Sequence, residues 1–273
     1  MTTSSRAARR KAPRCLRREC KAGSIELSLT PEQFVALGEQ PPFVGKSLRF
    51  FISYHHSDGR LAGKIKESLE EYGAEVFVAH DDLQGGVAWQ NEVLRSLKQA
   101  DVFVAVLTPN FRSSKFTDQE IGVAVSEQKL IIPLMVDRDS VPHGFISPIQ
   151  GFRFQFTRER GSDQEVPDCD LAAADVVNHI LATQYRPQLV DSIIRAFINS
   201  SSFVQANSRV KFVEKIKDSL SPEHVLGIIR EGFLNRQIYD GNVASRVLRE
   251  TILPQHSAVN PEMISELTTF LNR

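Results

Sequence analysis

Hydrophobic residues in the first two thirds of the chain form short continuous runs that alternate with amphipathic segments. Three runs are nearly uninterrupted and rich in Phe, Ile and Val: residues 48–54, 102–107 and 130–136. This character is typical of strands that are buried on both faces of a parallel sheet. Two further segments, residues 75–78 and 152–156, predict a short second strand and a last strand at the edge of the sheet.

The segments between these runs carry apolar residues at helical spacing. We expect helices over residues 58–72, 87–99, 117–128 and 171–183. In the helix at 87–99, this spacing predicts that Val93, Leu94 and Leu97 point inward. Because strands and helices alternate, the pattern predicts an α/β domain with an open, five-stranded parallel sheet.

The pattern changes after residue 187, because no strand candidate follows and every apolar stretch has helical spacing. The predicted helices cover residues 189–199, 205–220, 222–234, 243–252 and 261–271. Ser221 and Asn260 each precede a proline and are expected to cap the helices that follow. The predicted organisation is therefore a tail (1–23), a connector with a short helix (24–47), the α/β domain (48–184) and an all-helical domain (185–273).

Charge is distributed unevenly along the chain, although the formal net charge of the 273 residues is zero. Residues 1–23 hold eight Lys or Arg and one Glu, so this tail carries +7 and the remainder −7. Such a basic, nearly apolar-free segment is typical of a disordered, solvated tail. There are two alternatives. The tail makes weak contact with a phosphate-rich surface such as nucleic acid, or it is an organellar transit peptide.

Membrane insertion and metal binding find no support in the residue pattern. No run approaches the roughly twenty apolar residues that a membrane-spanning helix needs. Cys15, Cys20 and Cys169 form a sparse, odd set without a zinc-binding pattern, and Asp81 with Asp82 is too short a cluster for a metal. We therefore expect a cytoplasmic protein that has no metal.

One acidic residue stands where an open α/β sheet places its ligands. Glu120 lies in the helical segment that follows the strand at 102–107, and ligands in such sheets bind beyond the carboxyl ends of the strands. The competing interpretation is structural, because acids are also favoured in the first turn of a helix, where this prediction places Glu120.

Several segments in order resemble the TIR (Toll/interleukin-1 receptor) domain. Residues 50–58 (FFISYHHSD) resemble its first sequence box, residues 82–86 (DLQGG) its BB loop, and residues 103–109 (FVAVLTP) the strand behind it. Residues 116–121 (FTDQEI) resemble the Trp-x-x-x-Glu segment of TIR domains that cleave NAD. The resemblance covers residues 48–183 and implies a flavodoxin-like sheet.

The resemblance also implies roles for individual residues, with NAD as the substrate and no cofactor. Glu120 matches the catalytic glutamate, and His55 and His56 match two positions that contact the nucleotide. Gln84 matches a BB-loop position, and Phe116 replaces the usual Trp. Trp89 lies one residue beyond Ala88, which holds the position where the family has an aromatic residue.

Two functions follow from this resemblance. The first is an NAD glycohydrolase or cyclase that acts as an effector or signal generator in prokaryotic immune defence, with self-association through TIR domains and a helical domain that senses a trigger or drives assembly. The second is a non-catalytic adaptor that binds other TIR domains through residues 79–86. A phosphoacceptor receiver domain is excluded, because His55 and His56 occupy the place of its acidic pair and Thr108 that of its aspartate.

Overall fold

The computed structural model describes residues 47–78, 87–159, 161 and 163–272. The predicted tail, the connector helix and the whole BB loop lie outside the described residues. The chain forms two compact units, one ending at Ile193 and the other beginning at Ile194, inside helix α7 (Arg186–Ile198).

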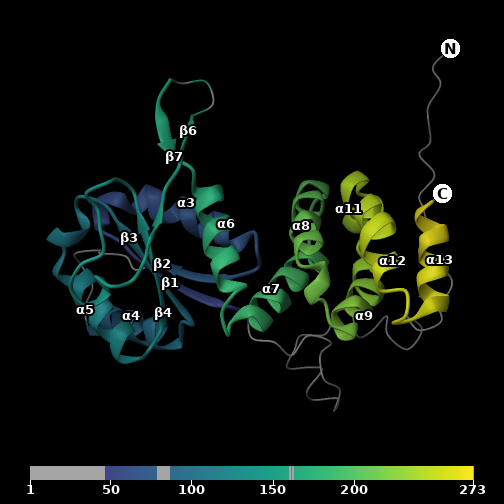
Figure 1. Cartoon of the computed structure of the whole chain (residues 1–273), viewed down its shortest axis with the longest axis horizontal. Helices are drawn as coiled ribbons and strands as arrows, with labels where there is room; N and C mark the ends of the chain where they lie inside the picture. Colours follow the sequence, from purple (N-terminus) through teal and green to yellow (C-terminus); the bar gives the residue numbers. More distant parts are fainter. Residues whose placement is uncertain (1–46, 79–86, 160, 162, 273) are drawn as a thin grey trace. The chain divides into compact units, whose positions relative to one another are not determined.

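The first unit is built on a five-stranded parallel sheet in the order β2-β1-β3-β4-β5 (Figure 1). Its strands are β1 (Arg49–Ser53), β2 (Glu75–Val78), β3 (Val102–Leu107), β4 (Leu130–Met135) and β5 (Phe152–Arg153). The predicted fold class is confirmed. All six residues of β3 are buried, as expected for a central strand covered on both faces.

Helices cover both faces of this sheet. On one face, α3 (Gly59–Glu70) packs against α6 (Cys169–Ile180), where the Ser68 hydroxyl donates to Asp170 Oδ1 at 2.7 Å. On the other face, α4 (Val87–Gln99) and α5 (Lys115–Ser126) share a buried apolar cluster with alternate residues of β1, β3 and β4. Within this cluster the ring of Phe51 stacks on Phe103, with centroids 5.8 Å apart.

The predictions for Leu94 and for the end of the last strand are wrong. Leu94 is 43% exposed, because it lies at the margin of a stripe that already turns Val93 and Leu97 inward. The last strand stops at Arg153, since Phe154 turns into the core. Beyond it, β6 (Phe156–Arg158) pairs with β7 (Glu165–Pro167) in an antiparallel hairpin, which the residue pattern does not predict.

Short 3-10 helices complete the connections of this unit. They are η2 (His56–Asp58), η3 (Phe111–Ser113) and η4 (Gly144–Ile146). Two of them, η2 and η3, follow the carboxyl ends of β1 and β3 and therefore shape the edge of the sheet that carries the candidate residues.

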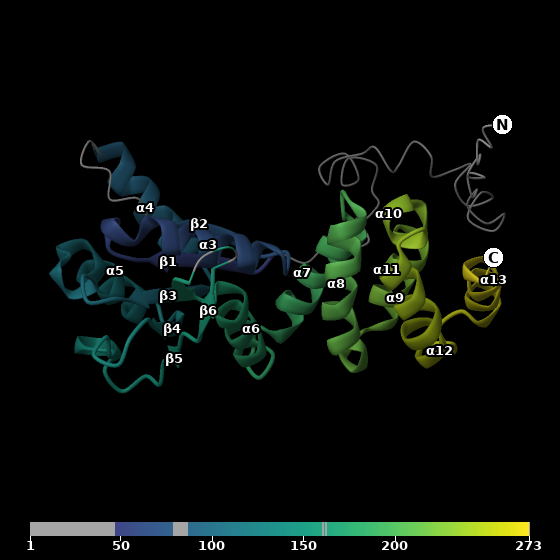
Figure 2. The same ribbon diagram turned by 90° about the horizontal axis from the view of Figure 1, so that it is seen from above.

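The second unit is helical over its described residues 194–272, which contain no strand. Its elements are α8 (Phe203–Lys215), η5 (Lys217–Ser219), α9 (Pro222–Arg230), η6 (Gly232–Leu234), α10 (Arg236–Tyr239), α11 (Asn242–Val247), the π-helix η7 (Leu248–Ile252), α12 (Leu253–Gln255) and α13 (Pro261–Leu271). Within this unit α8 packs beside α11 (Figure 2). None of the helices in the described residues has both the length and the apolar character needed to cross a bilayer.

Both predicted caps of the second unit are confirmed. The Ser221 hydroxyl accepts from the backbone N–H of His224, whose ring accepts in return from the N–H of Ser221. Asn260 Oδ1 accepts from the N–H of Met263. Each cap is followed by a proline at the first helical position, where a missing N–H costs no helical hydrogen bond.

Two glycines of the first unit give stability predictions of opposite sign. A Cβ at Gly151, just before β5, would lie 2.8 Å from the backbone oxygen of Pro133 in β4. A Cβ at Gly63, inside α3, would meet nothing within 4 Å. We expect Gly151→Ala to lower the free energy of unfolding by about 1–3 kcal/mol. We expect Gly63→Ala to raise it by about 0.4–1 kcal/mol. Urea unfolding of both variants measures this, and a Gly151→Ala protein as stable as the wild type would contradict the close approach.

Candidate active site

The candidate residues gather where the strand order of the sheet reverses. Strands β1 and β3 are neighbours, yet the chain leaves β1 toward β2 and leaves β3 toward β4 on the opposite side. Such a switch point leaves a space at the carboxyl ends of the two strands, where open α/β sheets bind their ligands. Ser53, the last residue of β1, is paired in register with Ala105 of β3 at this point.

Glu120 reaches this switch point from α5. Its side chain is only 9% exposed, and Ser53, which is fully buried, donates its hydroxyl to Glu120 Oε2 at 2.5 Å. A carboxyl group removed from water needs hydrogen-bond donors to remain stable, and Ser53 supplies one. The structure therefore places an acidic side chain, held by a hydrogen bond, at the carboxyl end of β1.

The helix that carries Glu120 begins earlier than the sequence predicts. Ser114 is the N-cap, and its hydroxyl accepts from the backbone N–H groups of Phe116 and Thr117. Because α5 starts at Lys115, Glu120 is its sixth residue and lies in the second turn, so its placement in the first turn is wrong. The attraction of acids to a helix N-terminus fades within the first turn, so this effect does not account for Glu120.

Ser53 is a residue that the motif comparison missed. The only signal for it in the sequence is its polarity, because Ser53 interrupts the apolar run from Phe50 to Tyr54. A fully buried serine at the end of a strand needs a partner, and here the partner lies 67 positions further along the chain. Local periodicity carries no information about such a contact.

Phe116 lies on the same side of α5 as Glu120, because residues four apart are neighbours on a helix. It is 43% exposed, whereas Glu120 is almost covered. The aromatic ring is therefore at the surface next to the buried carboxyl group.

The two histidines follow β1 directly. Their rings lie 4.1 Å apart between centroids; His55 is half-buried and His56 is exposed. His55 Nδ1 accepts from the backbone N–H of Ser57 at 3.3 Å and lies 2.8 Å from the Ser57 hydroxyl. In neutral His55 the proton is consequently on Nε2, which makes Nε2 a donor.

Side-chain hydrogen bonds join the loops that follow β1 and β3. Asn110 Nδ2 donates to the Ser57 hydroxyl at 3.1 Å, and the Thr108 hydroxyl donates to Asp58 Oδ2 at 2.6 Å. Ser57 thus connects His55 to the loop after β3. These bonds hold the histidine loop against the strand end that leads to α5.

Asp137 and Cys169, in the same unit, have pKa values shifted by their surroundings. Partial burial raises the pKa of Asp137, but hydrogen bonds from Ser140 and Asp139 and the charge of Arg153 outweigh it and lower the pKa from its ordinary value. Burial raises the pKa of the Cys169 thiol to about 11, which keeps it protonated and a poor nucleophile. No cluster of His, Cys, Asp and Glu able to hold a metal occurs among the described residues.

The structure brings together Ser53, Glu120 and the loop that carries His55 and His56, with Phe116 beside Glu120. Gln84 lies outside the described residues. Trp89 belongs to α4, but its side chain is also outside what the structure describes. Their roles stay predictions.

Fold and site define a doubly wound α/β domain with an acidic residue at its switch point. Residues 50–166 match the family described as the TIR domain, and the chain therefore contains a TIR domain. The chain is 34% identical over 100 residues to the NAD(+) hydrolase tir-1 of Caenorhabditis elegans, a match that covers 33% of this chain and 10% of that protein. It is 34% identical over 101 residues to the NAD(+) hydrolase sarm1 of Drosophila melanogaster, which covers 34% of this chain and 7% of the relative. The chain thus spans about a tenth or less of the length of these curated relatives.

A double-mutant cycle tests whether Ser53 and Glu120 interact as the structure indicates. We expect Ser53→Ala to destabilise the protein by about 1–3 kcal/mol, because Glu120 then loses a buried donor. In a Glu120→Leu background, Ser53→Ala no longer leaves a buried carboxyl group without its donor. We therefore expect the loss in free energy of unfolding to be about 1–2 kcal/mol smaller there than in the wild type. Chemical denaturation of the four proteins measures the coupling. Equal costs in the two backgrounds would show that the hydrogen bond does not form, and Ser126→Ala, at the exposed end of α5, serves as the neutral control.

Proposed function

We propose that this protein cleaves NAD at the nicotinamide–ribose bond as a glycohydrolase or cyclase. One observation carries the proposal: the TIR domain places the buried Glu120 carboxyl group, bonded to Ser53, at the carboxyl end of β1. The similarity of the chain to two NAD(+) hydrolases supports it.

The chemistry of this cleavage suits a single carboxylate. As the bond to nicotinamide breaks, positive charge develops on the ribose, and a nearby carboxylate stabilises that charge. Nicotinamide leaves as a neutral molecule, so no general acid is required. Glu120 is proposed for this role, with Ser53 orienting its carboxyl group through the hydrogen bond to Oε2.

The remaining candidates are proposed to bind the substrate. With Nδ1 occupied by the Ser57 N–H, His55 has Nε2 available to donate to a pyrophosphate oxygen. His56 is exposed beside it. Phe116 and Trp89 are proposed to stack on the nicotinamide or adenine ring, and Gln84 to contact the nucleotide from the BB loop. NAD is a substrate in this scheme, and no cofactor or metal takes part.

The role in immune defence is proposed on the resemblance, and the cytoplasmic location on the sparse cysteines of the sequence. We place the protein in the cytoplasm as a TIR effector or signal generator of prokaryotic immune defence, in which the helical unit senses a trigger or drives assembly. The product is either ADP-ribose or a cyclised form of it.

Replacing the proposed catalytic carboxylate tests the enzyme directly. We expect Glu120→Gln to reduce nicotinamide release from NAD by about 10²–10³-fold, because the amide cannot neutralise the charge that develops on the ribose. Glu127→Gln is the matched control, since Glu127 is exposed at the end of the same helix and is expected to keep full activity. Circular dichroism of both variants checks that they fold. Wild-type turnover with an equally active Glu120→Gln protein would remove Glu120 from the mechanism.

Self-association through the TIR domain predicts that activity depends on protein concentration. If a neighbouring protomer completes the site through its BB loop, nicotinamide release per molecule should rise with concentration and with a crowding agent, and then level off. Analytical ultracentrifugation on the same samples should show assembly over the same range. Constant activity per molecule down to concentrations at which the protein is monomeric would contradict a shared site.

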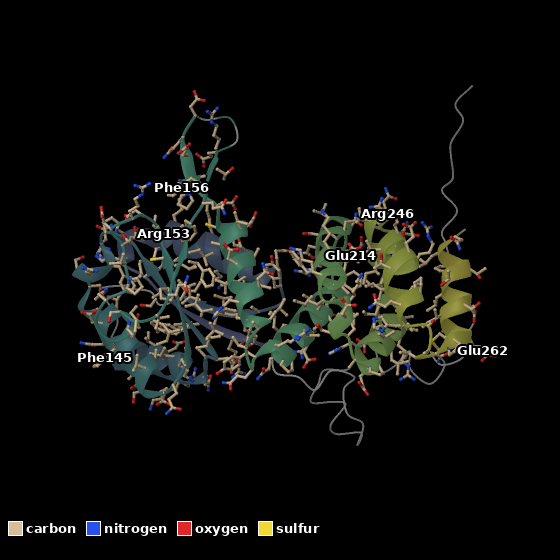
Figure 3. The ribbon with its side chains drawn as sticks, viewed as in Figure 1. Phe145, Arg153, Phe156, Glu214, Arg246 and Glu262 are labelled. Atoms are coloured by element: carbon tan, nitrogen blue, oxygen red, sulfur yellow. The ribbon has the colours of Figure 1, made fainter. Side chains whose placement is uncertain are left out.

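A non-catalytic adaptor is the second candidate, favoured by apolar side chains that face solvent. Phe145 in η4, labelled in Figure 3, is 74% exposed. Val141 is 40% exposed. Their loop is held against the start of α5, where His143 Nε2 lies 3.2 Å from Asp118 Oδ1. Exposed aromatic residues of this kind are enriched at protein interfaces. Absence of nicotinamide release in every oligomeric state, together with loss of TIR binding when residues 79–86 are substituted, would favour the adaptor.

A further inference from the structure

The second unit contains an open pocket that the proposed NAD chemistry does not use. Its volume is about 560 Å³, within the range of small-molecule sites. The lining comes from four parts of the unit, namely the start of α8, α10 with the residue after it, the α11–η7 segment and the end of α13: Phe203, Arg236, Asp240, Asn242, Ser245, Arg246, Arg249 and Leu271.

Arg246 offers the pocket a complete set of guanidinium donors. Its side chain is exposed on α11 (Figure 3), and within the described part of the chain it has no ion pair or hydrogen bond. Asn242 and Ser245, on the same short helix, likewise make no side-chain hydrogen bond with the residues that the structure describes. Three polar side chains of the lining are therefore ready to bind a polar ligand.

Arg236 adds donors from a second element. Its Nε bonds to Asp240 Oδ2 at 3.0 Å, which fixes the plane of the guanidinium group. The two terminal nitrogens have no partner among the described residues. A guanidinium held in this way loses less conformational freedom on binding an oxyanion than a mobile one does.

Arg249 also lines the pocket, but its guanidinium group is already bonded to other residues of the unit. Its Nη2 pairs with Glu250 at 2.5 Å, and its Nη1 donates to the backbone oxygen of Leu271 at 3.4 Å. Arg249 lies in the π-helical turn η7, which comes just before Pro254. Proline has no N–H for a helical bond, and a wider turn is one way in which a helix accommodates this loss.

An aromatic surface completes the lining. Phe203, the first residue of α8, lines the pocket and is 42% exposed to solvent. We propose that the pocket binds a nucleotide, with its phosphate groups on Arg246 and Arg236 and its base against Phe203. Planar guanidinium groups bind phosphate through paired hydrogen bonds, and an aromatic ring stacks on a base.

A small nucleotide fits these observations better than a nucleic acid strand does. Asp240 lines the pocket and is paired with Arg236, and Glu250 is paired with Arg249. These carboxylates interrupt the positive surface that an extended phosphate backbone requires. The positive charge is concentrated at Arg246, in a concave site of limited volume.

The test uses the full-length protein and ATP as the probe. Isothermal titration calorimetry of the wild type should show saturable binding. Arg246→Ala should weaken it about tenfold or more, as expected for the loss of a charge-assisted, bidentate contact. Adenosine, which lacks phosphate, and inorganic triphosphate, which lacks a base, should each bind more weakly than ATP. Phe203→Ala should reduce the affinity for ATP but leave that for triphosphate unchanged.

Matched controls separate this pocket from the candidate active site. Arg230→Ala, an exposed arginine in the last turn of α9 that does not line the pocket, should bind ATP as the wild type does. Glu120→Gln should also bind ATP as the wild type does. The ATP-binding test therefore gives the same result whether or not the protein cleaves NAD. Absence of saturable binding, or equal affinity in the Arg246→Ala protein, would overturn the proposal, as would binding of a DNA oligonucleotide that ATP does not displace.

Discussion

The buried hydrogen bond between Ser53 and Glu120 is the contact on which the organisation of the site depends. It joins the last residue of a central strand to the second turn of a helix across the point where the strand order reverses. Side chains alternate along a strand, so Ser53 lies on the same face of the sheet as Phe51, which packs in the cluster under α4 and α5. A shift of β1 by one residue would turn Ser53 toward α3 and α6 and separate it from Glu120. The register of the hydrophobic sheet therefore determines where the acidic group lies.

The loops at the same edge of the sheet add to this organisation by local bonds. Thr108 and Asn110, which follow β3, hold Asp58 and Ser57, which follow β1. As Ser57 also donates to His55, the orientation of the imidazole depends on both loops. The packing of the strands thus brings two chain segments together, and a few side-chain bonds then fix how the histidine presents its second nitrogen.

The parts that the sequence predicts well are those that depend on local pattern. The apolar segments are sufficient to identify β2 and β3 with their observed bounds. For β3 the reason is that a strand buried on both faces leaves no polar positions. The hairpin of β6 and β7 is missed since its strands have three residues each and are largely exposed, so no apolar alternation marks them. The early start of α5 at Lys115 is missed because both Ser114 and Thr117 belong to residue types that favour N-caps. The partnership of Ser53 and Glu120 arises from tertiary packing, and only the structure shows it.

The energetics of this partnership also bear on why an acid stands at position 120. Burying a carboxyl group costs free energy, and the hydrogen bond from Ser53 offsets part of that cost. Replacing both partners of a buried hydrogen bond by apolar side chains of similar shape is often neutral or stabilising. Ile121 and Ala124 of the same helix are already packed in the apolar cluster, so α5 has an anchor to the sheet without Glu120. Because α5 has this separate anchor, the place of Glu120 at the switch point favours a role in chemistry there, and that is the physical reason to prefer the enzyme over the adaptor as the proposed function.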